Sequence, residues 1–565
     1  MSRQTHLRMW PGVVISILLL ASYAIPIVAP GAFLYALIGG VVAALLMVLW
    51  WVFFSGAPWS ERAGAVMLMA IGLAVTSRFL DVSIATAGQG ALFYIHAIRL
   101  LGLALFVWAL LSRDLSVGAR WSSMIATIVI ACGLWTLLRS GGITGDGQSE
   151  LAWRWSETPE ERLLAEVEDV PAAPPAAHIE ADWPGFRGPG RDSVLPGVRI
   201  ETDWEKAAPV ELWRRPVGPG WSSFAVGGGF LYTQEQRGDD EIVACYDATT
   251  GEPVWQHADP ARFYESNGGA GPRATPTLLD GRVYSFGATG IANVLDAADG
   301  SLVWSRDVAA DSDTKVPGWG FASSPLVVDD VVIIAAAGTL VGYDRATGEP
   351  RWMGSKGGDG YSSPHRLTID GVEQVLLQNG TGAISVAPDD GALLWEHPWP
   401  GFRIVQPTLI AGGDLLVTSA NDGGGLGTRR IAVTRGPGGW NVEQRWTSNR
   451  LKPYFNDFVV HDGHAFGFDG RILTCIDLDE GERQWKGGRY GHGQLVLLAD
   501  QDVLLVLSED GEIALVAATP DRFTEIARVT AIDGKTWNHP VLVGDVLYVR
   551  NGQEMAAFRL SLARL

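Results

Sequence analysis

A motif of the form Asp-x-x-x-Gly-x-x-x-Trp recurs along the chain. It reads YDATTGEPVW (246–255), LDAADGSLVW (295–304), YDRATGEPRW (343–352) and IDLDEGERQW (476–485). Two copies are less complete: APDDGALLW (387–395) has Ala387 at the Asp position, and VTRGPGGWNVEQRW (433–446) is longer. The Asp-to-Gly segment indicates a tight turn between strands, in which Gly supplies a positive φ. We expect each Trp to begin the following strand and to pack between neighbouring sheets.

The spacing of these motifs predicts a β-propeller. Successive motif tryptophans from Trp255 to Trp485 lie 49, 48, 43, 51 and 39 residues apart, a period that suits four strands per blade. A seventh unit without a Trp follows at 512–529, and an eighth ends at 554–560 without its outer strand. The segment ELWRRPVG (211–218) carries Trp213 and supplies the missing strand. We therefore predict an all-β, eight-bladed propeller over 183–565 whose ring is closed by its N-terminal strand.

Two rings of residues are predicted at the starts of the innermost strands, facing the propeller axis. The first ring is polar: Ser223, Thr275, Ser324, Ser363, Gln406, Asn456, His492 and His539. The second lies two residues earlier and is mostly aromatic: Trp221, Arg273, Ala322, Tyr361, Ile404, Tyr454, Tyr490 and Trp537. A funnel lined in this way is suited to a planar, acidic ligand, because aromatic rings stack on its faces while Arg and amides take its oxygens.

Candidate site residues follow from these rings. The candidates for cofactor binding are Trp221, Arg273, Tyr361, Asn456, Tyr490, His492, Trp537, Asn538 and His539. Asp457 is a candidate catalytic base, and Asn456 with Asp457 is a candidate Ca²⁺ or Mg²⁺ site. The alternative interpretation is structural: Ser and Thr at the axis bond only water, and the aromatic residues pack between blades. Glu235 and Arg237 are interpreted as a surface salt bridge.

The first 140 residues are predicted to form a membrane anchor. Five apolar stretches, near 12–29, 32–54, 63–80, 90–111 and 121–138, are each about long enough to cross a hydrocarbon core of roughly 30 Å. The placement of arginines favours an N-terminus inside the cell, so residues after 140 are expected on the outer face of a bacterial inner membrane. His96 and Arg99 fall within the fourth stretch. They are interpreted either as a quinone headgroup site or as groups that pair with Asp81 or reach the interface.

Charge and cysteine content exclude several classes of function. Residues 1–140 hold eight Arg and three acidic residues, a net charge of +5, which leaves −24 for the remainder of a chain whose total is −19. An acidic soluble part argues against nucleic acid as a partner. The three cysteines form neither a C-x-x-C-H motif nor paired zinc-type spacing, so we predict no haem and no zinc.

Residues 141–182 are predicted to connect the anchor to the propeller. Thr158, Pro159 and Glu161 form a capping box with a Pro start, which predicts a short helix. The segment PAAPPAA (171–177) is expected to be a stiff spacer. The segment DWPGFRGPGRDS (182–193) is interpreted as a loop packed on a surface.

The repeats YDATTGEPVW, YDRATGEPRW and IDLDEGERQW resemble those of the PQQ-like (pyrroloquinoline quinone) propeller superfamily. This superfamily contains quinoprotein dehydrogenases as well as non-catalytic propellers, among them the lipoprotein of the outer-membrane β-barrel assembly machine. An anchor followed by a propeller is also similar to the membrane-bound quinoprotein glucose dehydrogenases. Segments such as KPYFNDFVVHDGH, GGRYGHGQ and DGKTWNHPV further resemble uncharacterised bacterial PQQ-like propeller proteins.

The resemblance to the dehydrogenases implies PQQ with Ca²⁺ or Mg²⁺ on the axis, an Asp base, and electrons passed to ubiquinone. This chain departs from that pattern, because its blades are compact, it has no vicinal Cys-Cys, and no Asp matches the base. We therefore expect a binding or scaffold propeller of the cell envelope that meets envelope proteins at the inner membrane. The alternative is a PQQ-dependent sugar or alcohol dehydrogenase.

Overall fold

The chain forms two compact units, which are described separately here. The computed structural model describes residues 9–29, 32–145, 147–166, 179–401, 404–410, 412–419 and 425–563. One unit comprises residues 1–156 with 265–269, and the other comprises residues 157–264 with 270–565. The helical unit extends past the predicted boundary at 140 because the hairpin β1(Leu138–Ile143)–β2(Ser149–Trp153) belongs to it.

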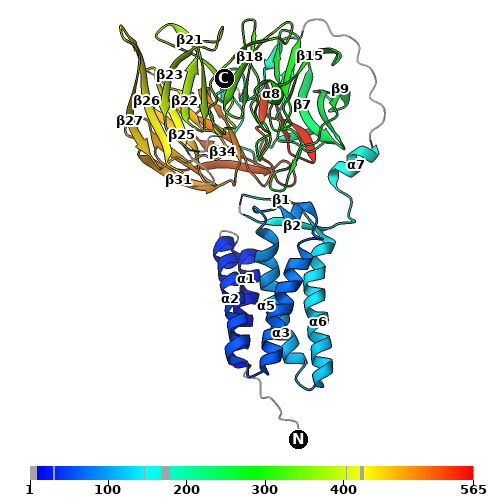
Figure 1. The fold of residues 1–565 in the computed structure, drawn as a ribbon. Helices are drawn as coiled ribbons and strands as arrows, with labels where there is room; N and C mark the ends of the chain where they lie inside the picture. The colour runs from blue at the N-terminus through cyan, green and yellow to red at the C-terminus, as the bar shows by residue number, and fades with distance from the viewer. Residues whose placement is uncertain are drawn as a thin grey trace. The chain divides into compact units, whose positions relative to one another are not determined.

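Long helices joined by short connections make up the first unit (Figure 1). They are α1(Trp10–Val28), α2(Phe33–Leu49) continued by the π-helix η2(Trp50–Phe54), α3(Trp59–Thr76), the short α4(Val82–Ala85), α5(Leu92–Leu111), and α6(Val117–Gly133) continued by the 3-10 turn η3(Leu134–Leu137). Because the connections are short, consecutive long helices run antiparallel, as Figure 1 shows.

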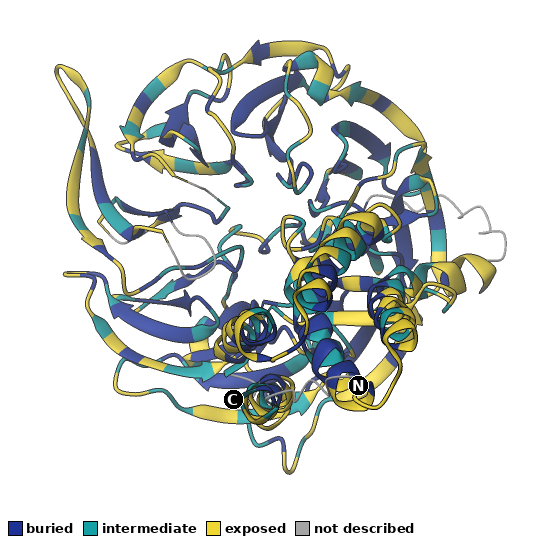
Figure 2. Ribbon diagram, turned by 60° about the horizontal axis from the view of Figure 1, so that its bottom comes forward, coloured by how far each residue is buried: buried dark blue, intermediate teal, exposed yellow. Residues whose placement is uncertain are grey.

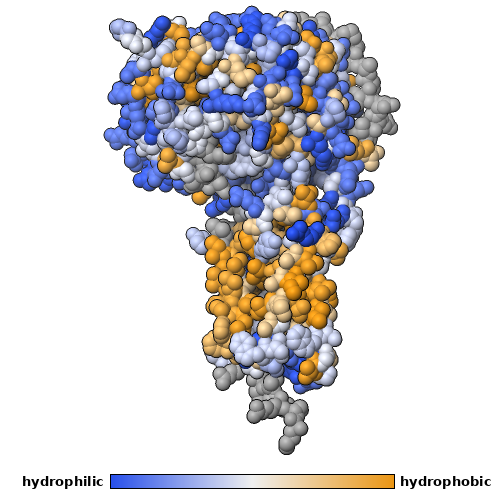
Figure 3. Space-filling view, in the orientation of Figure 1, coloured by the Kyte–Doolittle hydropathy of each residue, from blue (hydrophilic) through white to orange (hydrophobic). Residues whose placement is uncertain are grey.

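Four of the helical segments described are long and apolar enough to cross a membrane: Trp10–Val28, Tyr35–Phe54, Leu92–Leu111 and Val117–Leu137. Their apolar side chains cover the outside of the bundle (Figure 3). The remaining predicted span, 63–80, corresponds to α3, which is 18 residues long. Glu61 and Arg62 lie in the first turn of α3 and lower its mean hydropathy. By length and composition, four of the five predicted spans are therefore suited to cross a membrane, and α3 falls short.

Buried charges in the bundle are held by neighbouring helices. Arg120 donates to both carboxylate oxygens of Glu61, at 3.1 and 2.8 Å. Arg99 is buried in α5 and donates to the carbonyl and hydroxyl oxygens of Ser22 in α1, at 3.1 and 2.9 Å. Arg99 therefore does not pair with Asp81, which lies 3.4 Å from Arg154 instead.

Eight sheets, each with four antiparallel blade strands, form the second unit and confirm the predicted propeller. The first four blades are β6(Ala225–Gly227), β7(Phe230–Arg237), β8(Asp240–Asp247), β9(Pro253–Asp259); β12(Thr277–Leu279), β13(Arg282–Phe286), β14(Ile291–Asp296), β15(Leu302–Asp307); β16(Leu326–Val328), β17(Val331–Ala336), β18(Thr339–Asp344), β19(Pro350–Met353); and β20(His365–Ile369), β21(Val372–Asn379), β22(Gly382–Val386), β23(Leu393–Pro398). The elements β10(Tyr264–Glu265) and β11(Gly269–Ala270) pair between the first two blades, and α8(Val308–Asp311) follows the second.

The remaining blades close the ring. They are β24(Thr408–Leu409), β25(Asp414–Ser419), β26(Gly427–Gly436), β27(Gly439–Ser448); β28(Val459–His461), β29(His464–Asp469), β30(Ile472–Asp477), β31(Arg483–Arg489); β32(Gln494–Leu498), β33(Val503–Leu507), β34(Glu512–Ala517), β35(Glu525–Thr530); and β36(Val541–Val543), β37(Val546–Arg550), β38(Glu554–Arg559), β5(Val210–Pro216). The pairing of β38 with β5 places Trp213 opposite Ala557, so the N-terminal strand completes the last blade as predicted. Two short strands, β3(Ala181–Trp183) and β4(Val194–Leu195), add to the inner edges of the first and seventh blades.

The motif Trp is the residue that the outermost strand of a blade buries. Strand β9 alternates exposed and half-buried residues around a buried Trp255, and β15 does the same around Trp304. Figure 2 shows this gradient, with buried inner strands and largely exposed outer strands. The core of the propeller therefore lies between blades, where the faces of neighbouring sheets meet.

Five of the motif tryptophans pack on the motif Gly of the next blade. Gly251 has a φ of 71°, and a Cβ placed on it would lie 2.6 Å from the ring of Trp213. The same contact joins Gly300 to Trp255, Gly348 to Trp304, Gly391 to Trp352 and Gly481 to Trp446. The indole N–H of Trp213 also donates to the carbonyl of Ala248, at 3.1 Å. The motif thus forms a contact between consecutive blades: the Trp comes from one copy of the repeat and the Gly from the next.

A buried polar network reinforces the closure between the eighth and first blades. Arg550 is fully buried on β37 and donates to Thr233 Oγ1 (2.5 Å), to the carbonyl of Gln234 (3.1 Å) and to that of Gly218 (2.9 Å). The carboxylate of Glu235 accepts from Gly218 N at 2.8 Å and lies 2.6 Å from Arg237. The predicted salt bridge between Glu235 and Arg237 is confirmed, but Glu235 is fully buried, so its predicted place at the surface is wrong.

The connector is partly described. Thr158 Oγ1 accepts from Glu161 N (2.9 Å) and Glu161 Oε2 accepts from Thr158 N (2.6 Å), which confirms the predicted capping box at the start of α7(Pro159–Glu166). The predicted spacer 171–177 lies outside the described residues.

We expect Arg550→Met to weaken the ring closure strongly. The substitution leaves the carbonyls of Gly218 and Gln234 buried without their donor, at about 1–3 kcal/mol for each group. Urea unfolding of the propeller measures the loss. The matched control is Arg559→Met, because Arg559 pairs with Asp545 at the exposed end of the next strand and an exposed pair contributes about 0–1 kcal/mol. Equal losses in the two variants would contradict the role given to Arg550.

Candidate functional site

A belt of hydrogen bonds runs around the axis at the predicted polar ring. In the first five blades the backbone N–H of the ring residue donates to the side-chain oxygen of the next blade's ring residue. The bonds are Ser223 to Thr275 (2.9 Å), Thr275 to Ser324 (3.0 Å), Ser324 to Ser363 (2.9 Å), Ser363 to Gln406 (2.8 Å) and Gln406 to Asp457 (2.8 Å). Ser223 Oγ donates to the carbonyl of His539 at 2.6 Å, which joins the first blade to the last. The Ser and Thr members therefore bond neighbouring blades.

The belt member of the sixth blade is Asp457, where we had predicted Asn456. Asp457 lies two residues before its innermost strand β28, as Ser324 lies two residues before β16. Asn456 is fully buried one residue earlier, and its Oδ1 accepts from Tyr454 N at 2.9 Å. Its Nδ2 has no hydrogen-bond partner among the residues that the structure describes.

The segment 184–193 fills the axis beside the belt. Leu278 N donates to the carbonyl of Pro184 (2.8 Å), and the ring of Phe186 meets that of His539 edge-on with centroids 5.1 Å apart. Leu497 N donates to the carbonyl of Ser193 (2.8 Å). One segment thus contacts the second, seventh and eighth blades. The prediction that this loop packs on a surface is therefore wrong. The segment lies inside the ring, and its glycines and arginines allow it to fit there.

Two arginines of this segment are bound to the inner strands. Arg187 donates to the carbonyl of Phe458 (2.7 Å), and its guanidinium lies 3.7 Å from Asp457 Oδ1. Arg191 donates to the carbonyls of Ser324 and Pro325, each at 3.0 Å. Burial and the neighbouring Arg187 lower the pKa of Arg191 to about 10. The segment therefore ties the third blade to the sixth across the axis.

Two histidines beside these arginines are held neutral. Burial, helped by the charge of Arg187, lowers the pKa of His539 to about 3. Burial and the charges of Arg191 and Arg187 place the pKa of His365 well below its usual value. Nδ1 of each ring has no partner within the described part of the chain. His539 is thus beside the axial segment, where it contacts Phe186.

Asp457 and Asn456 do not fit a divalent cation. Asp457 Oδ1 already accepts from Gln406 N and faces the guanidinium of Arg187, whose positive charge opposes a second cation there. Burial raises the pKa of Asp457, against the opposing effect of Arg187. Asn456 Oδ1 is engaged by Tyr454 N. These contacts give Asp457 a structural role.

An aromatic cluster lies at the mouth of the funnel. Ring centroids are 4.7 Å apart for Trp221–Trp537, 4.9 Å for Phe455–Trp537, 5.0 Å for Tyr454–Phe455, 5.8 Å for Trp319–Tyr454 and 5.3 Å for Trp319–Tyr361. Lys535 Nζ lies 4.4 Å from the ring centroid of Trp537 and 5.3 Å from that of Trp221. All six rings are half-buried. Trp319 and Phe455 were not predicted, although the Trp in PGWG (317–320) precedes an innermost strand.

The structure brings only part of the predicted set to this mouth. His492 is buried against Tyr454 and Phe455, with centroids 5.2 and 5.0 Å apart. Arg273 donates to the carbonyls of Trp319 (3.2 Å) and Ala270 (3.3 Å). Trp221, Trp537 and Tyr361 belong to the cluster itself.

Two predicted residues serve blade packing. Asn538 Nδ2 donates to the carbonyl of Ser222 at 2.7 Å and so ties the eighth blade to the first. Tyr490 is buried, and its hydroxyl bonds Glu525 (2.5 Å) on the outermost strand β35.

Glu241 is a buried acid that the sequence analysis did not single out. Its Oε1 accepts from Ala288 N and its Oε2 from Thr289 Oγ1, both at 3.1 Å, across the boundary between the first and second blades. Burial is the largest effect on this carboxyl and raises its pKa to about 7. No local motif marks it, because its environment comes from the neighbouring blade.

Comparison with known proteins identifies one family. A family model described as "Outer membrane protein assembly factor BamB" matches residues 205–360 and 239–487. A curated protein of that name from Yersinia pestis is 25% identical over 347 residues, covering 57% of this chain and 73% of its own length. Its counterpart from Shewanella oneidensis is 27% identical over 375 residues, covering 60% and 86%.

Solved structures of propellers are also similar. A quinohemoprotein alcohol dehydrogenase from Pseudomonas putida HK5 matches with a TM-score of 0.49 and 13% identity, over 68% of this chain and 81% of that one. BamB from Moraxella catarrhalis matches with a TM-score of 0.43 and 16% identity, over 62% and 98%. At such identities these two structures carry no information about activity.

We expect Arg187→Met to destabilise the propeller by about 3–5 kcal/mol, because Asp457 is left buried without its cation. The double variant Arg187→Met/Asp457→Asn should recover part of this loss, since Asn can still accept from Gln406 N. Urea unfolding compares the variants. Arg306→Met, which removes a partly exposed partner of Asp311, is the control with an expected loss of about 0–1 kcal/mol. A double variant no more stable than Arg187→Met would argue against the Arg187–Asp457 coupling.

Glu241 should make stability depend on pH near neutrality. Its folded pKa of about 7 lies above the usual value of 4.5 for a Glu carboxyl, so the folded state binds more protons between these values. Stability should therefore fall as the pH rises through this window, by up to about 3 kcal/mol, and stay lower above it. In Glu241→Gln this dependence should be absent. The difference in unfolding midpoint between wild type and variant, measured at several pH values, tests this; a constant difference would exclude it.

Proposed function

Because this chain belongs to the PQQ-like β-propeller family, we propose that it is a membrane-anchored binding or scaffold protein of the bacterial cell envelope. The relatives from Yersinia pestis and Shewanella oneidensis are named outer membrane protein assembly factors. From that name we take only the class of partner, which is other proteins of the envelope. Such a role requires a stable surface and requires no reacting group.

The contents of the axis are the observation that carries this proposal. The chain's own segment 184–193 lies beside the belt, and Arg187 and Arg191 bind carbonyls of the inner strands there. Asp457, the candidate base, is engaged by Arg187 and Gln406 N. The polar residues of the axis are thus used to hold blades together, which supports a scaffold over a quinoprotein.

We place the partner contact at the aromatic mouth. Trp221, Trp319, Tyr361 and Trp537 are half-buried and adjacent through ring contacts, and Lys535 lies over two of the rings. Trp and Tyr are enriched at the centres of protein interfaces, since they supply large contact area at low entropic cost. The positive charge of Lys535 favours a partner segment that carries a carboxylate.

We propose that α3 crosses the inner membrane together with the four apolar spans, which gives five crossings and places the propeller outside. The start of α3, the end of α5 and the start of α6 lie at the end of the antiparallel bundle where α1 begins, so this end gathers Arg62, Arg113 and Arg120. Positive charge of this kind marks the cytoplasmic side. Glu61 is paired with Arg120, which lowers the cost of placing the first turn of α3 near the membrane.

Site-specific photo-crosslinking in cells tests the mouth. A photoreactive amino acid at Trp221 or Trp319 should give discrete cross-links to envelope proteins. The same group at Leu302, an exposed residue on the outermost strand β15, should give none. Lys535→Glu should reduce the cross-links at Trp221 about tenfold if a partner carboxylate contributes a charged contact worth roughly 1.4 kcal/mol. Equal cross-linking at Leu302 and Trp221 would contradict the proposal that the aromatic mouth contacts the partner.

Titration of the purified chain with PQQ and Ca²⁺ separates the scaffold from the dehydrogenase. We expect no stoichiometric binding and no dye reduction with sugars or alcohols. Stoichiometric PQQ binding together with dye reduction would replace the scaffold proposal by the dehydrogenase, whatever the cross-linking shows.

A further inference from the structure

One position in the innermost hairpins has an exceptional residue in the sixth blade. The last residue of the innermost strand pairs with the first residue of the next strand and closes a two-residue turn. In the second, third, fourth and eighth blades this closing residue is aliphatic: Leu279, Val328, Ile369 and Val543. In the sixth blade it is His461, followed by Asp462 and Gly463 in the turn. A position that is aliphatic in four other blades here presents an imidazole.

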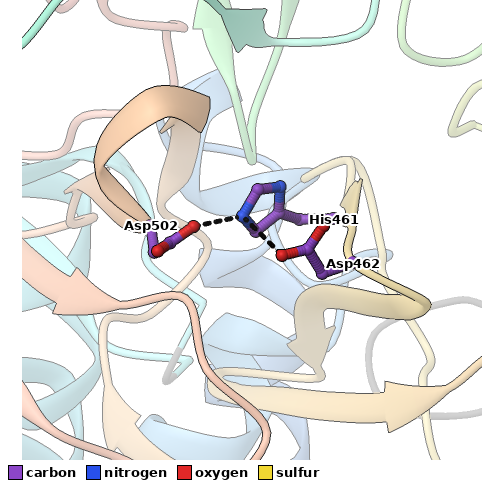
Figure 4. A group of neighbouring side chains, drawn as sticks. All are labelled: His461, Asp462 and Asp502. Atoms are coloured by element: carbon purple, nitrogen blue, oxygen red, sulfur yellow. Dashed lines mark hydrogen bonds and ion pairs between the residues drawn. The ribbon is translucent and has the colours of Figure 1, made fainter.

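His461 faces carboxylates from two blades (Figure 4). Its Nε2 lies 2.6 Å from Oδ1 of Asp502 and 3.8 Å from Oδ2 of Asp462. Asp502 follows the 3-10 turn η4(Ala499–Gln501) in the corresponding hairpin of the seventh blade. One nitrogen and one oxygen from each carboxylate all lie within 4.8 Å of one another. Three metal-ligating side chains therefore converge between two blades.

The charge balance of this cluster also differs from that of the turns in the second and third blades. In the second blade the turn residue Asp280 pairs with Arg345 at 2.6 Å. In the third blade Asp330 pairs with Arg351 at 2.5 Å. Within the described residues, neither Asp462 nor Asp502 has a Lys or Arg partner, and His461 is the basic group that reaches them. The two carboxylates are thus left without the permanent positive charge that the turns of the second and third blades receive.

The turns that carry the ligands are fixed by their own blades. Leu478 N donates to the carbonyl of Gly463 at 2.9 Å, and Ala518 N donates to the carbonyl of Asp502 at 2.8 Å. The imidazole of His461 is only 14% exposed, whereas both carboxylates are open to solvent. The ligands therefore require small side-chain rotations to converge on one ion, and water can reach the remaining position.

We propose that His461, Asp462 and Asp502 bind one Zn²⁺ ion and thereby link the inner hairpins of the sixth and seventh blades. His461 Nε2 and one oxygen of each carboxylate would supply three bonds, and water the fourth, which is a donor set that suits zinc. The His461–Asp502 hydrogen bond is replaced by coordination: Nε2 gives up its proton, and the ring binds the ion in its neutral form with a proton on Nδ1. The site uses no cysteine, which is why a search for paired cysteine spacing predicted no zinc.

Zinc titration of the full chain in detergent, purified without a polyhistidine tag, tests the site. A chromophoric chelator as competitor reports the affinity. We expect one Zn²⁺ per chain from this site and a loss of affinity of about tenfold or more in His461→Leu, because a ligand is removed. Leu is the matched replacement, since Leu279 occupies the equivalent position in the second blade. Asp462→Asn and Asp502→Asn should weaken binding in the same direction.

His464→Gln is the control, because His464 pairs across the strands with His461 while its Nδ1 lies 2.7 Å from the carbonyl of Asp462. This variant should bind Zn²⁺ as the wild type does. Co²⁺ gives a second readout: the wild type should show the intense visible bands of a four-coordinate ion, and His461→Leu should not. Unchanged Zn²⁺ stoichiometry and affinity in His461→Leu, or no binding by the wild type, would overturn the proposal.

Discussion

The contact between a Trp of one blade and a Gly of the next is the interaction on which the propeller depends. The ring of Trp213 occupies the space that a side chain at residue 251 would need, and its indole N–H reaches the carbonyl of Ala248 in the same turn. One residue thus buries apolar surface and also satisfies a backbone acceptor. The contact therefore fixes the distance and angle between neighbouring blades. Repeating this contact around the ring produces the curvature that lets β5 meet β38.

The sequence predicts what this repeated contact controls. The blade count, the closing strand and the place of the polar ring all follow from the spacing of local motifs, and the structure has them where expected. In the sixth blade the predicted ring residue, Asn456, is one position away from the residue found in the belt, Asp457. The segment YFNDFVV has polar residues at both positions, and only the hydrogen bond from Gln406 N distinguishes them. Residue spacing alone could not resolve that choice.

What the sequence did not predict depends on contacts between distant segments. Glu235 and Arg237 lie in a polar stretch, which predicts exposure to solvent. In the folded protein they are buried, and Glu235 accepts hydrogen bonds from Gly218 N and the Tyr246 hydroxyl. The segment 184–193 is rich in Gly, Pro and Arg, a composition typical of exposed loops. Its partners are carbonyls on strands more than a hundred residues away, such as that of Phe458, and no local pattern reveals them. The pKa of Glu241 has the same origin.

The closure of the ring also has a consequence for the order of folding. The segment from Trp183 to Pro216 supplies an edge strand to the first blade, the axial contacts with Arg187, and the outer strand of the last blade. Its partner strand β38 lies more than three hundred residues later, so the last native pairings have a very high sequence separation. Folding that must wait for such pairings is slow, because the loop-closure entropy is lost before the contacts form. During synthesis the incomplete ring would therefore present unpaired strand edges until its final blade emerges, which makes the assembling chain itself a substrate for chaperones.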